Sequence, residues 1–269
     1  GNDTAGSFTG GLPFASIQAA VTAAGTNQDI VVLPGTYTGN VTLLNGQRLL
    51  GSGSSLITPQ GAVRPVLNGA GITLADGNTI DFIRIQGTPG DAIFGNGVNG
   101  ATISNCEIAS TTNNGSGIED SRATGTWTVM NNTITGMNSI GVLFRNQTGD
   151  NLVAVVSGNT ITGNQNGAVS VTSVQTGTTR VQLVNNVMTG TVNTGATCEA
   201  ISSDTANVCL DITGNTNDDT YSFERVDLSA TLEVEELSHL TSLNSGSATV
   251  SNGNTFSPAT EVADGACGF

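Results

Sequence analysis

The sequence predicts an all-β protein, a right-handed parallel β-helix of about seven coils, closed by an N-terminal cap helix and a C-terminal helix and strand cap. Three observations predict this fold. The 269 residues include 36 Gly and only 4% aromatic residues, apolar residues alternate with polar ones, and a short phrase recurs at a nearly constant interval. Short strands joined by tight turns have this composition and this period of two.

The recurring phrase ends in an apolar residue that follows a polar turn. These apolar residues are Ile108, Ile134, Ile161 and Met188, so the steps between them are 26, 27 and 27 residues. Alternating apolar runs precede each phrase, and a small residue followed by an apolar one comes after it. We therefore expect three short strands per repeat, which stack on the next repeat and form one continuous core over residues 30–217.

An asparagine recurs just before the apolar residue of the phrase. Asn132, Asn159 and Asn186 occupy equivalent positions in three repeats. In a stacked solenoid their side chains would form a hydrogen-bonded ladder at a turn, and Asn also tolerates the left-handed conformation of such a turn. We interpret this ladder as structural. The neighbouring Cys106 is interpreted as a small buried apolar residue.

The two ends of the chain differ from the repeats. Residues 1–29 form the predicted N-terminal cap, with an amphipathic helix over residues 12–24 that Gly25 ends. Residues 218–269 are expected to break the repeat and to serve as a C-terminal cap or a docking element. A second amphipathic helix is predicted over residues 231–243 within this segment.

The charge balance excludes several partners. Seven basic and 21 acidic residues give a net charge of −14. Binding to nucleic acid or to an anionic membrane surface needs clustered positive charge, so neither partner is expected. The sequence contains no run of 18 apolar residues, so no membrane insertion is expected either. The acidity keeps the protein in solution, or some of the acids bind calcium; no metal ligands can be assigned.

The cysteines point to an oxidising compartment. Cys198 and Cys209 bracket a short polar loop and are the candidate disulfide. Metal-binding cysteine spacing is missing, and His239 is the single histidine of the chain. We expect a secreted protein, extracellular or at the cell surface. A signal peptide has then been removed, or the chain is a piece of a longer protein.

The N-terminal segment carries a family resemblance. Residues 14–21, 29–37 and 40–42 resemble the cap and first coil of the pectin-lyase-like superfamily, and residues 80–215 are similar in style to its coils. That superfamily includes pectate lyases, polygalacturonases, pectin methylesterases, phage tailspikes and many bacterial surface proteins. The resemblance therefore implies the fold and says little about function.

Two enzymatic roles follow from that resemblance. Residues 90–96 resemble the pectin methylesterase segment that carries the nucleophile, which implies that role for Asp91. The earlier Gln-Asp pair and the later Arg-Pro-Trp of that family are not found in order. A pectate-lyase-like arrangement would use Arg122 as base beside Glu119 and Asp120. Stacking would bring these acids, together with Arg145, near one face, although a surface ion-pair group explains the same residues.

These observations favour a non-enzymatic extracellular module, part of an adhesin, a surface fibre or a filament. The repeats carry no motif beyond those that form the coils, and a complete catalytic set is missing. The C-terminal segment differs in pattern from the repeats. Such a module would associate head to tail, or would bind a glycan or a cell-surface receptor. The alternatives are a polysaccharide-active enzyme, either a calcium-dependent pectate-type lyase or a pectin-methylesterase-like protein, and a glycan-binding module without turnover.

Overall fold

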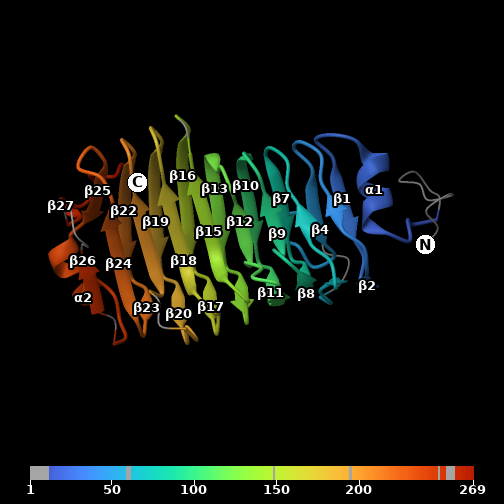
Figure 1. Cartoon of the computed structure of the whole chain (residues 1–269). Coiled ribbons are helices and arrows are strands. Elements are labelled where there is room, and N and C mark those ends of the chain that lie inside the picture. The colour runs from blue at the N-terminus through green and yellow to red at the C-terminus, as the bar shows by residue number, and fades with distance from the viewer. Residues whose placement is uncertain (1–11, 59–61, 148, 194–195, 248, 253–257) are drawn as a thin grey trace.

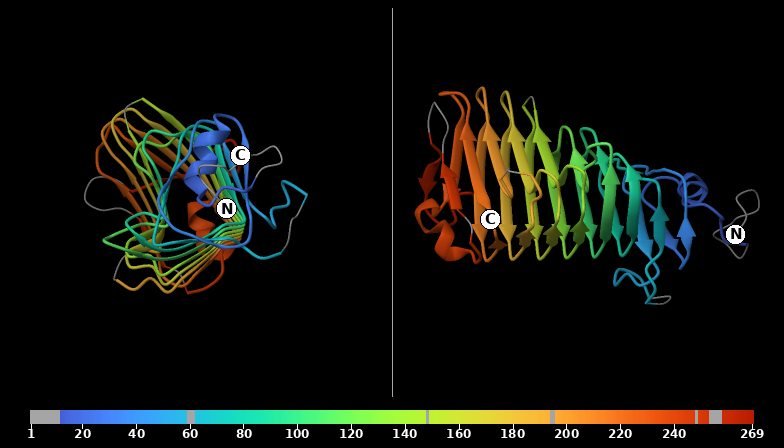
Figure 2. Two further views of the ribbon diagram at one scale, coloured as in Figure 1. Left: turned by 90° about the vertical axis from the view of Figure 1, so that its right-hand side faces the viewer. Right: turned by 60° about the horizontal axis from the view of Figure 1, so that its bottom comes forward.

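The computed structural model describes residues 12–58, 62–147, 149–193, 196–247, 249–252 and 258–269. Residues 1–11 of the expected N-terminal cap lie outside this part. The described chain winds into a right-handed parallel β-helix, as predicted, with strands stacked side by side along one axis (Figure 1). Viewed along that axis, the strands of successive coils superpose and the turns project around them (Figure 2).

The strands of the coils form three parallel sheets, which we number in the order in which the chain passes through them. Sheet 1 consists of β1 (Asp29–Val32), β4 (Arg48–Gly51), β7 (Asn78–Asp81), β10 (Asn99–Ser104), β13 (Thr124–Met130), β16 (Asn151–Ser157), β19 (Thr178–Val184), β22 (Asn207–Thr213), β25 (Thr231–Glu235) and β27 (Thr260–Val262). Sheet 2 consists of β2 (Thr36–Tyr37), β5 (Val66–Asn68), β8 (Arg84–Pro89), β11 (Glu107–Thr112), β14 (Thr133–Thr135), β17 (Thr160–Thr162), β20 (Val187–Thr189) and β23 (Thr216–Asn217). Sheet 3 consists of β3 (Val41–Thr42), β6 (Ile72–Thr73), β9 (Ile93–Gly95), β12 (Ile118–Asp120), β15 (Ile140–Asn146), β18 (Gly167–Ser173), β21 (Cys198–Ser202), β24 (Thr220–Arg225) and β26 (Thr249–Asn252).

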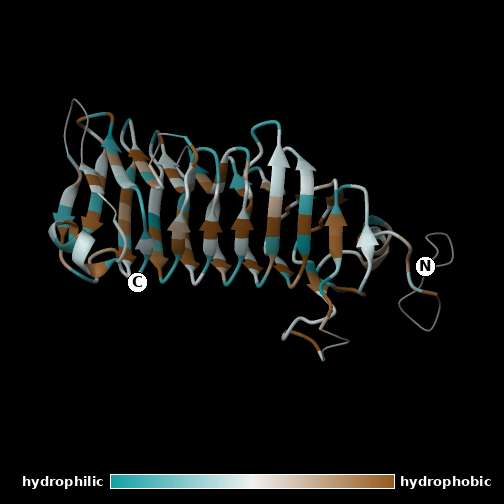
Figure 3. Ribbon diagram, turned by 90° about the horizontal axis from the view of Figure 1, so that it is seen from below, coloured by the Kyte–Doolittle hydropathy of each residue, from teal (hydrophilic) through white to brown (hydrophobic). Residues whose placement is uncertain are grey.

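The predicted repeat sets the register of the coils. Ile108 pairs with Ile134, Ile134 with Ile161, and Ile161 with Met188, and each of these side chains is buried. Apolar positions recur at the same level of successive strands (Figure 3). Within the described residues, eight successive coils supply a strand to all three sheets, one more than the expected number.

The turn between sheets 1 and 2 holds a column of asparagines. The backbone N–H of Asn132 donates to Oδ1 of Asn159 at 2.9 Å, and that of Asn159 donates to Oδ1 of Asn186 at 3.0 Å. The same contact continues from Asn186 to Asn215 and from Asn215 to Asn244. The column is thus two residues longer than the three that the sequence indicated.

The side-chain amides of the column also form hydrogen bonds with backbone carbonyl groups. The Nδ2 groups of Asn132, Asn159 and Asn186 donate to backbone carbonyls at 2.8–2.9 Å. The positive φ angle expected of these residues belongs instead to the residue before each of them, such as Asn131 at 55° and Gly158 at 65°. The turn therefore divides two tasks, hydrogen bonding and chain reversal, between neighbouring residues.

The N-terminal end is covered by the helix α1 (Ile17–Ala24), which lies against β1 and β3 (Figure 1). Ser16 caps it by accepting a hydrogen bond from the N–H of Ala19, so the helix begins later than residue 12. Gly25 ends it at a φ of 75°, as the sequence indicated. Gln47 of the second coil donates to the carbonyl of Val21 and ties the helix to the shaft.

The helix predicted over residues 231–243 is wrong in its first part. Residues 231–235 form β25, in which Leu232 and Val234 are buried and alternate with outward residues, because the strand pairs with β22. The helical part is confined to η1 (Leu237–His239) and α2 (Leu240–Leu243). Beyond residue 218 the described chain continues sheets 1 and 3, whereas sheet 2 ends at β23, so the expected break of the repeat affects only one of the three sheets. No described helix is long and apolar enough to span a membrane.

The disulfide expected between Cys198 and Cys209 is also wrong. Cys198 points into the solenoid and is 1% exposed, whereas Cys209 lies on the outer face of β22, so the wall of the solenoid separates them. Cys209 instead forms a disulfide with Cys267, from 58 residues later in the chain. Cys106 and Cys198 are buried free thiols.

Candidate functional site

A polar cluster lies on the outer face of sheet 3. Asp91 precedes β9, Ser116 precedes β12, Glu119 lies in β12 and Arg145 lies in β15. Ile118, which neighbours Glu119, is fully buried in the core, so strand alternation turns Glu119 outward. The parallel pairing of β9, β12 and β15 places these residues on three successive coils.

The four residues form one connected chain of contacts. The backbone N–H of Ser116 donates to Oδ1 of Asp91 at 2.7 Å, and its hydroxyl donates to Oε2 of Glu119 at 3.2 Å. Arg145 Nη1 forms an ion pair with Oε1 of Glu119. The side chain of Glu119 is 12% exposed and that of Arg145 is 43% exposed, so the guanidinium closes the cluster toward solvent.

The environment of Asp91 favours its neutral form. Burial raises the pKa of the Asp91 carboxyl above its ordinary value, and the charge of Glu119 raises it further. The hydrogen bond from Ser116 and the charge of Arg145 lower the pKa of Asp91, but they do not outweigh burial. Asp91 therefore takes up a proton more readily than a fully solvated aspartate does.

Two hollows extend the polar face along the axis. A shallow one of about 130 Å³ lies beside Asp91 and is lined by Asn40, Thr73, Thr88 and Phe94 among others. The second measures about 520 Å³ and lies over the later coils. Its polar lining residues are Thr191, Asn193, Asp219, Thr220, Ser222 and Ser251.

The outer face between the two hollows carries further polar groups. Ser170 follows Leu143 in register, Glu199 follows Ser170, and Ser222 follows Glu199. The Ser170 hydroxyl lies 3.4 Å from Oε2 of Glu199. Ser170 is buried, whereas Glu199 and Ser222 are half-buried and can exchange hydrogen bonds with a hydroxylated ligand.

Two residues predicted for the site lie elsewhere. Asp120 follows Glu119 in the strand and consequently faces inward, where its carboxylate accepts hydrogen bonds from the N–H groups of Gly97, Val98 and Arg122. Burial raises the pKa of Asp120, and its role is to hold the turn of the preceding coil. The guanidinium of Arg122 donates to Oδ1 of Asn96 at 3.2 Å, at the turn that leads to sheet 1.

The predicted set thus divides into two. The structure brings together Asp91, Glu119 and Arg145, and it separates Asp120 and Arg122 from them. Sequence reasoning missed Ser116, which joins the two acids. Its signal was present, because Ser116 directly precedes the small residue that opens the third strand of its repeat. No described residues bring together three or more His, Cys, Asp or Glu side chains that could hold a metal ion.

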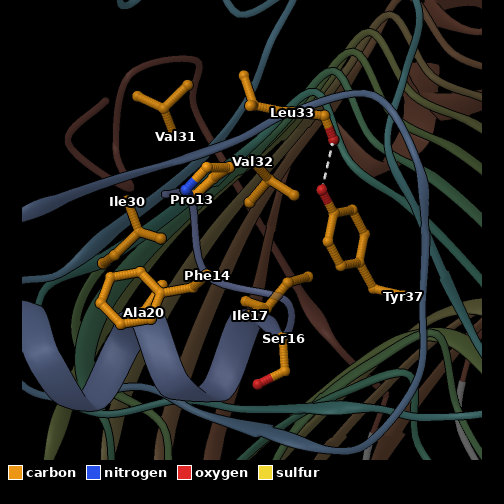
Figure 4. Close-up of a pocket in the computed structure, with 10 residues that line it drawn as sticks. All are labelled: Pro13, Phe14, Ser16, Ile17, Ala20, Ile30, Val31, Val32, Leu33 and Tyr37. Carbon is orange, nitrogen blue, oxygen red and sulfur yellow. Dashed lines mark hydrogen bonds between the residues drawn. The ribbon is translucent and has the colours of Figure 1, made fainter. Parts of the chain in front are cut away.

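A different pocket lies at the N-terminal end, between α1 and β1 (Figure 4). Phe14, Ile17, Ile30 and Val32 contribute apolar side chains to it, and the Tyr37 hydroxyl donates to the carbonyl of Leu33 at 2.9 Å. Polar groups do not converge in this pocket. We interpret it as the packing seam of the cap helix and not as a part of the site.

Two solved structures from Azotobacter vinelandii match the chain at low identity. The A-module of mannuronan C-5 epimerase AlgE4 is 13% identical, with 93% of this chain and 95% of that chain covered at a TM-score of 0.31. The A-module of mannuronan C-5 epimerase AlgE6 is 15% identical, with 91% and 92% covered at a TM-score of 0.31.

The sequence comparisons concern the family. No curated protein matches the chain. The family described as "Right handed beta helix region" matches residues 63–219, which is more than half of the chain. These residues include the polar cluster and the asparagine column as far as Asn215. The chain therefore belongs to the right-handed β-helix family.

Proposed function

We propose that the chain is a non-enzymatic extracellular β-helix module that binds a carbohydrate along the outer face of sheet 3 and serves adhesion. The observation that carries this proposal is the connected cluster of Asp91, Ser116, Glu119 and Arg145. The carboxylates of Asp91 and Glu119 and the guanidinium of Arg145, on neighbouring coils, offer acceptors and donors in a fixed spacing, and the buried Ser116 holds the two acids together. A chain of sugar hydroxyls can use such groups without any covalent step.

The contacts within the cluster favour binding over turnover. Glu119 is held in an ion pair with Arg145, so it is poorly placed to act as a free base. Asp91 is held by the N–H of Ser116. Asp120 and Arg122, which would complete a lyase-like set, face other parts of the molecule. Catalysis of glycosidic chemistry needs at least two groups with separate acid and base roles.

Location and assembly are part of the same proposal. The Cys209–Cys267 disulfide supports an extracellular or cell-surface location, because disulfides persist in oxidising compartments. Association head to tail and binding to a cell-surface receptor are further proposals. Sedimentation velocity over a range of protein concentrations tests self-association, and a constant monomer mass would contradict it.

A glycan array followed by titration calorimetry tests the binding proposal. Replacement of Glu119 by Gln removes the ion pair with Arg145 and one acceptor charge. We expect binding of the selected glycan to weaken by about 10–100-fold, the worth of one hydrogen bond to a charged group. Glu107→Gln, in β11 on the outer face of sheet 2, likewise removes an ion pair, with Arg64 and Arg84, and is the matched control that should bind normally. Equal affinity of both variants, or an array without any bound glycan, would contradict the proposal.

A second candidate function is a polysaccharide-active enzyme. The observation that favours it is the raised pKa of Asp91 beside a second carboxylate, which suits a general acid. Assays on acidic polysaccharides with and without calcium test this function. Product formation that Asp91→Asn abolishes, with glycan affinity retained, would establish the enzyme and overturn the non-enzymatic module.

A further inference from the structure

The end of the chain folds back over the outside of sheet 1. β27 pairs with β25 as the last strand of that sheet, and residues 263–269 then return toward earlier coils. Figure 1 shows this return, with the C-terminus beside β19 and β22 although β27 lies at the far end of the shaft. We call residues 258–269 the strap.

Three separate attachments hold the strap. The first is the pairing of Thr260, Glu261 and Val262 with β25. The second is Glu235, whose side chain lies beneath the strap and accepts hydrogen bonds from the N–H groups of Gly265 at 3.0 Å and Cys267 at 2.5 Å. The third is the disulfide between Cys267 and Cys209 of β22.

A small thiol can approach the disulfide from the side of Cys209, which is half-buried, whereas Cys267 is 1% exposed. Both cysteines line an open hollow of about 260 Å³ on the outer face of sheet 1. Arg180 and Glu233 flank Cys209 in register on the two neighbouring strands, so one positive and one negative side chain border the disulfide.

The two free thiols cannot take part in this exchange. Cys106 and Cys198 are each 1% exposed and face the interior, on the other side of the wall from Cys209. Burial raises the pKa of each thiol to about 12, so the reactive thiolate form is scarce. Reduction of Cys209–Cys267 therefore yields two thiols that have no other cysteine to pair with.

We propose that Cys209–Cys267 is a site of reversible thiol–disulfide exchange with a dithiol, and that reduction unlatches the strap. A thiolate of the dithiol attacks one sulfur and forms a mixed disulfide while the other cysteine leaves as a thiolate. The second thiol of the dithiol then displaces the protein sulfur. The dithiol is oxidised to its disulfide, and Cys209 and Cys267 are reduced to thiols. Without the covalent tie, β27 separates from β25 and exposes that edge of sheet 1.

Hydrogen exchange with mass spectrometry on the full chain, before and after mild treatment with dithiothreitol, tests this proposal. We expect exchange of the 260–267 amides to accelerate about 100-fold on reduction, while the coils before β22 keep their protection. Iodoacetamide should then label Cys209 and Cys267 and leave Cys106 and Cys198 unlabelled. Cys198→Ala, which keeps the disulfide, should respond like the unaltered chain.

A second variant separates the latch from general instability. Glu235→Gln weakens the two hydrogen bonds under the strap, so it should speed exchange of the strap about tenfold more in the reduced chain than in the oxidised chain. Unchanged protection of the strap after confirmed reduction would overturn the proposal. Labelling of all four cysteines at one rate would also overturn it, because the whole fold would then have opened.

Discussion

Two columns of stacked side chains run along this solenoid, and they behave differently. At the turn between sheets 1 and 2, Asn132, Asn159 and Asn186 repeat one residue type and are at most 2% exposed. Their hydrogen bonds go to other asparagines of the column and to the backbone. On the outer face of sheet 3, Asp91, Glu119 and neighbouring groups differ from coil to coil and remain partly open to solvent.

The difference separates scaffold from site. A column of identical residues forms the same hydrogen bonds with the backbone in every coil. No donor or acceptor of the column then remains free for a ligand. A column of unlike residues gives each coil its own chemistry, and its charges reach outward. We infer that in this fold a column of identical residues stabilises the solenoid. A column of unlike residues on an exposed sheet face indicates a binding site.

The largest expected effect comes from breaking the scaffold column. Asn159→Ala removes the acceptor of the Asn132 N–H and the donor to the carbonyl of Val129, and leaves both groups buried. Two unsatisfied buried groups cost about 3–5 kcal/mol of unfolding free energy together. Urea denaturation measures this loss. Thr160→Ala, at the exposed neighbouring position, is the control. A similar loss of unfolding free energy in both variants would show that the column does not stabilise the fold more than a surface residue does.

A smaller effect tests the division of labour within the same turn. Asn131 has a φ of 55° and occupies the place that Gly158 takes in the next coil. Asn131→Gly should change the unfolding free energy by less than about 0.5 kcal/mol, whereas Asn131→Val should lower it by about 1–2 kcal/mol, because a β-branched residue is strained at positive φ. Equal stability of the two variants by urea denaturation would show that the backbone relaxes to suit the side chain.

The same comparison explains what the sequence could predict. The repeat of Ile108, Ile134 and Ile161 fixes register, so the fold, the sheets and the inward residues follow from spacing alone. The sequence also predicts that Glu119 and Asp120 face opposite sides of the sheet, because successive residues of a strand do so. The two side chains could therefore not have belonged to one site.

Long-range contacts could not be predicted in the same way. The partner of Cys209 lies in a tail whose path depends on folding back across two coils, and no local spacing encodes it. The segment 231–235 has apolar spacing compatible with a helix, and its strand conformation depends on the neighbouring β22. The contact between Ser116 and Glu119 likewise requires the turn geometry and not only the repeat.

The smallest expected effect concerns the site and its pH dependence. Since the pKa of Asp91 is raised above the ordinary 3.8 by burial, the folded state binds a proton more tightly than the unfolded chain does. Its stabilising contribution is then fully present below about pH 3.8 and is lost as pH rises through the folded pKa. Asp91→Asn cannot ionise and therefore does not lose stability as the pH rises, and its amide oxygen still accepts the hydrogen bond from the Ser116 N–H. The variant should gain stability relative to the unaltered chain as the pH rises from about 3.8 through the folded pKa of Asp91.

Thermal unfolding at a series of pH values measures the gain. Ser116→Ala is the matched control, because it keeps both the Asp91 carboxyl and the backbone donor and should retain the original pH dependence. A difference between Asp91→Asn and the unaltered chain that does not vary with pH would mean that the carboxyl is solvated like an ordinary surface acid. The outer face of sheet 3 would then lose the feature that distinguishes it from a set of surface ion pairs.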